Sequence, residues 1–166
     1  MATLIAIPIL GILTVLQSAI VSRMPLLHGI ADLVLLVVIA WALQEPVKTA
    51  WQWSILGGLM MGFASILPVI IPVISYLLIT SLALFVKQKI WENQIFAMFA
   101  MTFLGSIISL AISAIAVSIQ GIILPIFDTL RLIILPSLLL NLLLAAPIFI
   151  LVKDLADWIY PEEIKV

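Results

Sequence analysis

The stretch ADLVLLVVIAWALQ, residues 31–44, places eleven consecutive apolar residues between Asp32 and Gln44. As a helix they would cover about 16 Å, which is too short to cross the ~30 Å hydrocarbon core of a membrane. Two structures are compatible with this length. Either the helix begins near Leu26 and carries His28 and Asp32 into the outer part of the membrane, or it is short and shielded by neighbouring helices. We favour the earlier start.

The rest of the chain is as apolar as this stretch. Of its 166 residues, 66% are hydrophobic and 9% are charged, whereas soluble domains carry about 25% charged residues. A small soluble domain exposes too much of its area to hide so much apolar surface, which excludes a soluble enzyme. The net charge of −1 offers no basic surface for nucleic acid, and there is no cysteine for disulfides or thiolate sites. The sequence therefore predicts an all-α integral membrane protein.

Charged and turn-forming residues divide the chain into six apolar segments. A membrane-spanning helix needs about 20 apolar residues, so six of them take about 120 and leave only short loops. We expect a single six-helix transmembrane domain over 1–166, with a short cytoplasmic tail over 153–166 that either continues the last helix or lies on the membrane surface. A polar loop is expected at 87–93. The expected helices are 3–22, one that ends at Gln44, 51–67, one between Pro72 and Phe85, 94–120 and 132–152.

The positions of lysine and arginine predict the orientation of the bundle. With six spans, five of these residues fall on the side of the N-terminus and two on the other side. Because cytoplasmic loops carry the excess of positive charge, we expect both termini to be cytoplasmic. The first group is Lys48, Lys87, Lys89, Lys153 and Lys165, and the second is Arg23 and Arg131.

Small and hydroxyl-bearing residues recur every three or four positions along several segments, so that each set lies on one helix face. Helices in lipid associate through such faces. They either hold the bundle together or receive the transmembrane helix of a partner. The third segment, with Gly58, Gly62 and Ser65, is our candidate for a partner's helix because its glycines allow the closest approach of two backbones.

Three positions within or beside the apolar segments could carry specific contacts. Asn141 lies in the middle of the sixth segment, where its amide needs a partner, either another helix of the bundle or the helix of a binding protein. Asp32, with His28 and Arg23, forms an ion pair or a helix cap at the outer face, or a docking point for an extracytoplasmic partner. Pro136 can open a local break in the helix beside Asn141.

The chemistry of a carrier or an enzyme is missing from the sequence. Ionisable residues inside a membrane are the usual pointer to transport or catalysis, and segments one, three, four, five and six have none in their interiors. His28 is the single histidine, and the serines have no basic partner at membrane depth to activate them. We therefore expect no catalytic residues, no metal and no cofactor.

Three short motifs resemble the rod shape-determining protein MreD family of the bacterial cell-elongation machinery. They are LPSLLLN at 135–141, which is followed by a later proline, ADLVLL at 31–36 and GGLMMGF at 57–63. The family's sixth helix has a similar Pro-Ser pair with an asparagine four residues after the serine. Its second helix opens with Pro-Asp-Leu, where this chain has Ala31 before the aspartate. The family often continues its glycine-rich helix with an aspartate, where this chain has Ala64 and Ser65.

The resemblance implies a non-catalytic scaffold in the bacterial inner membrane that binds the transmembrane helix of an MreC-like partner. It also implies work beside a RodA-type glycosyltransferase with its transpeptidase and an MreB-like filament, and a bundle similar to the substrate-binding subunits of energy-coupling-factor transporters. A vitamin-binding subunit of such a transporter is the alternative function, and a lipid-handling protein ranks last because the uncharged interior offers no path for a headgroup. The candidate partner-binding residues are Gly58, Gly62, Ser65, Asp32, Pro136 and Asn141.

Overall fold

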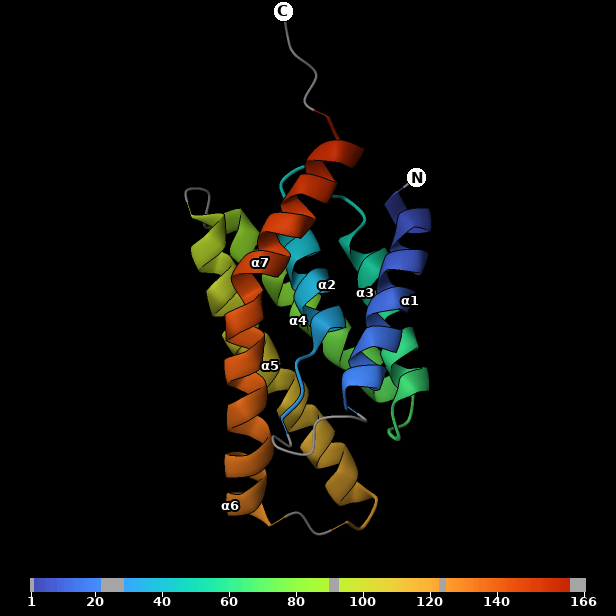
Figure 1. Ribbon diagram of the computed structural model, residues 1–166, viewed down its shortest axis with the longest axis vertical. Coiled ribbons are helices and arrows are strands. Elements are labelled where there is room, and N and C mark those ends of the chain that lie inside the picture. The colour runs from blue at the N-terminus through green and yellow to red at the C-terminus, as the bar shows by residue number, and fades with distance from the viewer. Residues whose placement is uncertain (1, 22–28, 90–92, 123–124, 162–166) are drawn as a thin grey trace, which may run out of the picture.

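The computed structural model describes residues 2–21, 29–89, 93–122 and 125–161, and all regular structure in these ranges is helical. The last three helical elements follow one another without a break, so the described chain forms six rods (Figure 1). In chain order, the elements are α1 (Ala2–Val21), α2 (Leu33–Leu43), α3 (Ala50–Ala64), α4 (Ile70–Lys89), α5 (Gln94–Ile119), α6 (Ile126–Thr129), the π-helix η1 (Leu130–Ile134) and α7 (Leu135–Ile159).

Four of the six rods are long and apolar enough to cross a bilayer. The other two, α2 with 11 residues and α3 with 15, rise about 16 and 22 Å, less than the ~30 Å of the hydrocarbon core. The chain is an all-α, multi-pass membrane protein with four candidate spans, and its two short helices need neighbours that cover their ends. The four spans are Ala2–Ala19, Ile70–Lys89, Gln94–Ile119 and Phe127–Ile159.

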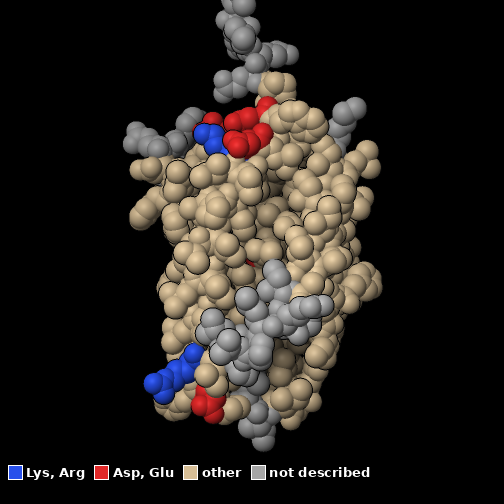
Figure 2. All heavy atoms as spheres, in the orientation of Figure 1, with Lys and Arg blue, Asp and Glu red and all other residues tan. Residues whose placement is uncertain are grey.

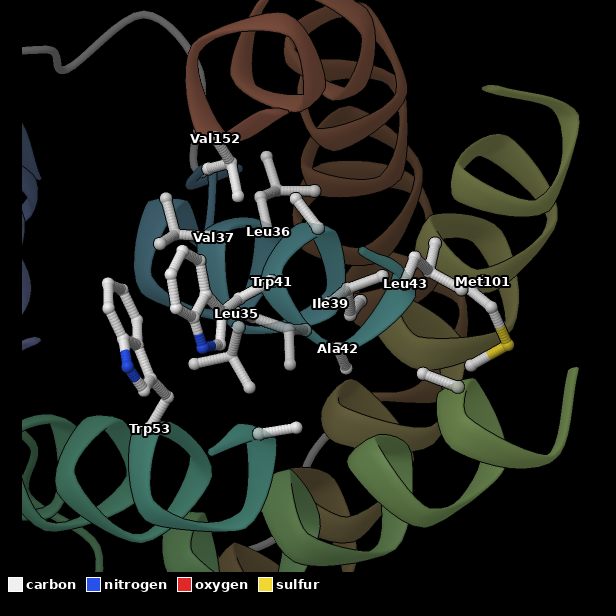
Figure 3. Close-up of a cluster of buried hydrophobic side chains, with 14 of the residues drawn as sticks. Leu35, Leu36, Val37, Ile39, Trp41, Ala42, Leu43, Trp53, Met101 and Val152 are labelled. Atoms are coloured by element: carbon white, nitrogen blue, oxygen red, sulfur yellow. The ribbon is translucent and has the colours of Figure 1, made fainter. Parts of the chain in front are cut away.

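Helix α2 lies at the centre of the bundle and contacts each of the five other rods. Ten of its residues, from Val34 to Leu43, are buried. Their side chains leave the helix in several directions, toward Trp53 on α3, Met101 on α5 and Val152 on α7 (Figure 3). A helix that is apolar on every side is typical of one surrounded by protein. The run of eleven residues can be short because neighbouring helices, instead of lipid, enclose it.

The expected start of this helix near Leu26 is wrong. Residues 29–32 are not helical, and α2 begins at Leu33 after an Asp32 whose side chain caps it. The structure therefore has the short, shielded helix that the sequence left as the second choice. Leu26, His28 and Arg23 lie outside the described residues.

Two further boundaries differ from those expected at the end of the molecule that holds both termini. Lys87 and Lys89 belong to the last turn of α4 instead of a polar loop, where a positive charge is stabilised by the helix dipole. Helix α7 runs on to Ile159, so the first half of the expected tail, residues 153–159, continues the last helix. At the end of that helix, the Tyr160 N–H donates a hydrogen bond to the Ala156 carbonyl at 2.8 Å.

Pro136 lies in the first turn of α7, which continues through Ser137 and Asn141, and the irregular segment is the π-helix η1 directly before α7. Proline has no N–H to donate to the carbonyl four residues earlier, so the regular ladder cannot pass through this position. At the residue directly before the proline, the Leu135 N–H bonds the Leu130 carbonyl five residues back, which is the wider spacing of a π turn. The local widening of the helix therefore ends about two turns before Asn141.

Both chain ends lie at the same end of the bundle (Figure 1). The last turns of α2, α4 and α7 and the first turns of α1, α3 and α5 meet there, and Arg131 in η1 belongs to the opposite end. On the face shown in Figure 2, charged spheres gather at these two ends, and the tan part of the wall between them has one small red spot. The described lysines, Lys48, Lys87, Lys89 and Lys153, all belong to the end with the termini.

The glycines of α3 are used for packing within the chain. A Cβ atom built on Gly58 would lie 2.7 Å from the Cα of Val73, and one built on Gly62 would lie 2.8 Å from the Cα of Val69. Both neighbours belong to α4 or to the residue that precedes it. This corrects the interpretation of Gly58 and Gly62 as a groove for a partner, because α4 already fills the space beside them.

We expect Gly58→Ala to lower the stability of the protein by about 1–3 kcal/mol, since the added methyl group forces two backbones apart. Gly11→Ala is the matched control, because nothing lies within 4 Å of the Cβ position there and alanine favours a helix over glycine. The measurement is the free energy of unfolding in mixed detergent micelles. Equal effects of the two substitutions would contradict the close α3–α4 contact.

Candidate functional site: a polar network at the start of α2

The first N–H groups of α2 need hydrogen-bond acceptors, which apolar side chains do not provide. The first N–H groups of any helix have no partner within the helix. At a membrane surface water would satisfy them, but α2 begins about 16 Å from its other end, near the middle of the hydrocarbon core. Backbone at that depth must find its hydrogen bonds within the protein.

Side chains from three places supply those bonds. The Asp32 carboxylate accepts from the Leu35 N–H at 3.0 Å as an N-cap. The Asp32 N–H donates to Oδ1 of Asn141 on α7 at 2.8 Å. The Leu33 N–H donates to Oε1 of Gln17 on α1 at 3.0 Å. Three of the N–H groups at the start of α2 are thereby satisfied, two of them by other helices.

A second set of bonds holds these capping groups in place. Tyr76 on α4 donates its hydroxyl to Oδ1 of Asp32 at 2.7 Å. Nδ2 of Asn141 donates to Oγ of Ser106 on α5 at 2.8 Å, and Oγ of Ser137 accepts from the Ile30 N–H at 2.9 Å. Tyr76, Ser106, Ser137 and Asn141 are all buried. The network therefore connects α2 to α1, α4, α5 and α7.

The chain before α2 also packs directly on the backbone of the last rod. A Cβ atom on Gly29 would lie 2.5 Å from Cβ of Pro136 and 2.6 Å from the backbone N of Ser137. Only a glycine can approach so closely. This contact brings Ile30 to the Ser137 hydroxyl and Asp32 to Asn141, so it sets the register between the coil and α7.

A small cavity of about 90 Å³ adjoins the Asp32 side chain. The end of α3, the start of α4 and the second half of α5 form its wall, which places it toward the end of the bundle opposite the termini. Its polar lining consists of oxygen-bearing side chains, and its apolar lining is Met61, Leu67 and Pro72. The polar residues are Asp32, Ser65, Ser75, Tyr76, Ser109 and Ser113.

The other end of α2 is capped from α4. The ammonium group of Lys87 donates to the carbonyl of Gln44, the C-cap residue, and to that of Glu45 at 3.3 Å. A cation at this position is stabilised by the negative end of the helix dipole. Just before it, Trp41 stacks on Trp53 of α3 with ring centroids 4.2 Å apart. An open crevice of about 370 Å³ lies beside Lys87, lined by Glu45, Leu84 and Gln88 as well.

The structure brings four of the six candidate residues together. Asp32 bonds Asn141, Pro136 touches Gly29 three residues before Asp32, and Ser65 lines the cavity beside Asp32. For Asn141 and Asp32, the interpretations as an interhelical bond and a helix cap are confirmed. The other two candidates, Gly58 and Gly62, lie along the α3–α4 contact.

Three members of the network, namely Gln17, Tyr76 and Gly29, were not identified from the sequence. Gln17 is the one carboxamide in the first apolar segment, and Tyr76 is the one phenol in the fourth. A buried polar side chain in a membrane needs a partner, so each was a signal in itself. Neither residue type indicates which helix supplies that partner, and Gly29 gives no sign of the close approach that it makes.

Comparisons with known proteins gave no match to a protein-family model, to a curated protein or to a solved structure. The chain's function must therefore be inferred from its own residues and from the motif resemblance. Its geometry describes a bundle in which polar side chains of α1, α4 and α7 bond the start of a central, half-membrane helix, and Ser106 of α5 bonds Asn141.

We expect Asn141→Ala to lower the free energy of unfolding by about 1–3 kcal/mol, because it leaves a buried N–H of Asp32 and the Ser106 hydroxyl without their partner. Asn93→Ala is the matched control, since Asn93 is exposed and its side chain makes no cap bond. The free energy of unfolding of each variant is measured in mixed detergent micelles. A loss no larger than that of the control would contradict the role of Asn141 in joining α2, α5 and α7.

Proposed function

We propose that this chain is an MreD-type scaffold of the bacterial cell-elongation complex, which binds and orients the transmembrane helix of an MreC-like single-span protein. The observation that carries the proposal is that the buried polar groups around Asp32 make hydrogen bonds within the bundle. They bond the start of α2 and one another, so what the outer faces of the bundle offer to a partner's helix is mainly shape. A scaffold needs a fixed shape, whereas a carrier or an enzyme needs reactive groups at membrane depth.

The partner's helix has to dock on an outward face, because α4 fills the space beside the glycines of α3. Helix α3 presents the exposed side chains Ile55, Leu59 and Phe63 on its outer side, four residues apart and hence on one face. At about 22 Å it is also shorter than the membrane. A full-length partner helix along this face would shield the ends of α3 from lipid.

The alternative, a vitamin-binding subunit of a transporter, has less support. Pockets for small organic ligands enclose about 300–1,000 Å³, whereas the cavity beside Asp32 has about 90 Å³. The 370 Å³ crevice at Lys87 lies at the helix ends instead of within the bundle. The scaffold is therefore the function that we propose.

The proposal places the chain in the bacterial inner membrane with both termini in the cytoplasm. The described lysines at the end with the termini support this orientation, since Lys and Arg are enriched on the cytoplasmic side. There an MreB-like filament would lie beside the lysine-rich end. The RodA-type enzyme and its transpeptidase would be neighbours within the membrane.

Co-purification with an MreC-like protein tests the proposal. We expect the tagged chain, co-expressed with the single-span protein and extracted in mild detergent, to retain it through two purification steps. An unrelated single-span protein of the same hydrophobic length serves as the control. Equal recovery of the two proteins, or of neither, would contradict the scaffold.

The absence of cysteine from the chain allows the docking face to be mapped with single introduced thiols. With a cysteine series along the partner's helix, we expect crosslinks to Leu59→Cys and Phe63→Cys on α3. Phe103→Cys on α5 and Leu139→Cys on α7 are controls that are likewise exposed to lipid. Crosslinks spread evenly over the three helices would contradict docking on α3 while leaving the co-purification result intact.

A further inference from the structure

The side chain of Asp32 is the one described carboxylate at membrane depth, and no ion pair joins it to a cation among residues 2–21, 29–89, 93–122 and 125–161. A charge in this position is costly unless it is compensated. The dipole at the start of α2 supplies about half a positive charge. The rest of the negative charge of the carboxylate is not compensated by the dipole, and the carboxylate lies beside the cavity.

The hydrogen bonds around Asp32 suit an ionised carboxylate. The Leu35 N–H and the Tyr76 hydroxyl both donate to Oδ1. An ionised carboxylate is purely an acceptor and can take several such bonds on its two oxygens. Both of these bonds reach Oδ1, so that Oδ2 has capacity left for another positive group.

The cavity provides the remaining requirements of a cation site. Its polar lining is made of oxygen atoms, including the hydroxyls of Ser109 and Ser113, which bond no other described group in the structure. Oxygen ligands are those that hard cations prefer. A volume of about 90 Å³ suits one small ion with one or two waters, since a water occupies about 30 Å³. A single carboxylate balances one positive charge.

We propose that the cavity between α3, α4 and α5 binds one sodium ion, with the Asp32 carboxylate as its counter-charge and the Ser109 and Ser113 hydroxyls as neutral ligands. The effect of the ion is to stabilise the junction of α2 with α4 and α5. This inference rests on the cavity and the network alone and is independent of the proposed scaffold function.

Thermal unfolding of the purified full chain in nanodiscs tests this site. Sodium chloride is titrated against choline chloride at constant ionic strength, because choline is too large for the cavity. We expect the unfolding temperature to rise by several degrees and then level off, as for a ligand that binds only the folded protein. The same unfolding curve in sodium and in choline would overturn the proposal, and an equal response to potassium would overturn the assignment to sodium.

Variants locate the site. Asp32→Asn keeps the size of the side chain and should abolish the sodium-dependent shift, whereas Asp128→Asn, an exposed aspartate on α6, should retain it. If Asp32→Asn does not fold, the double variant Ser109→Ala with Ser113→Ala decides. It should need several-fold more sodium for the half-maximal shift. A sodium dependence like that of the unmodified protein, in whichever of these variants folds, would place the ion elsewhere and overturn the site.

Discussion

The start of α2 in the middle of the membrane is the constraint on which the rest of the structure depends. A helix of eleven residues reaches only about half-way across the hydrocarbon core, and its first N–H groups meet no water there. The chain satisfies them with Gln17 from α1, Asn141 from α7 and the carboxylate of Asp32 itself. These side chains can serve only if α1 and α7 pack against α2, so the capping requirement also dictates the arrangement of the rods.

This arrangement explains how a chain with so few polar groups defines one structure. Packing between apolar side chains in lipid is weakly directional, because lipid tails are as apolar as leucine. The polar contacts around Asp32 fix the register of α2 against four rods, and Lys87 fixes its other end against α4. Close backbone contacts at Gly58 and Gly29 then hold α3 against α4 and the coil before α2 against α7. A bundle held in this way keeps a constant outer surface, which is the property that the proposed scaffold needs.

The sequence predicted the membrane class, six helices and the need of Asn141 for a partner, because composition and isolated polar residues are local signals. It expected all six helices to be full spans, whereas four are long and apolar enough to cross a membrane. It did not predict the start of α2 at Leu33, since the choice between a longer helix and a shielded one depends on what surrounds it. Gly58 shows the same limit: a glycine face permits a close approach, but the sequence does not say whether the other helix is α4 or a partner's. The role of Gln17 depends on a hydrogen bond between α1 and the Leu33 N–H of α2, and the sequence does not say which helix lies beside Gln17.

Amide hydrogen exchange at Leu33 tests the central claim most directly. The measurement compares the unmodified protein with Gln17→Leu in nanodiscs, with amides in the middle of α5 as the internal reference. The account predicts slow exchange at Leu33 in the unmodified protein and a clear acceleration there in Gln17→Leu, with α5 unchanged. Slow exchange that persists in the variant would show that the start of α2 does not depend on a cap from another helix, and would contradict the account.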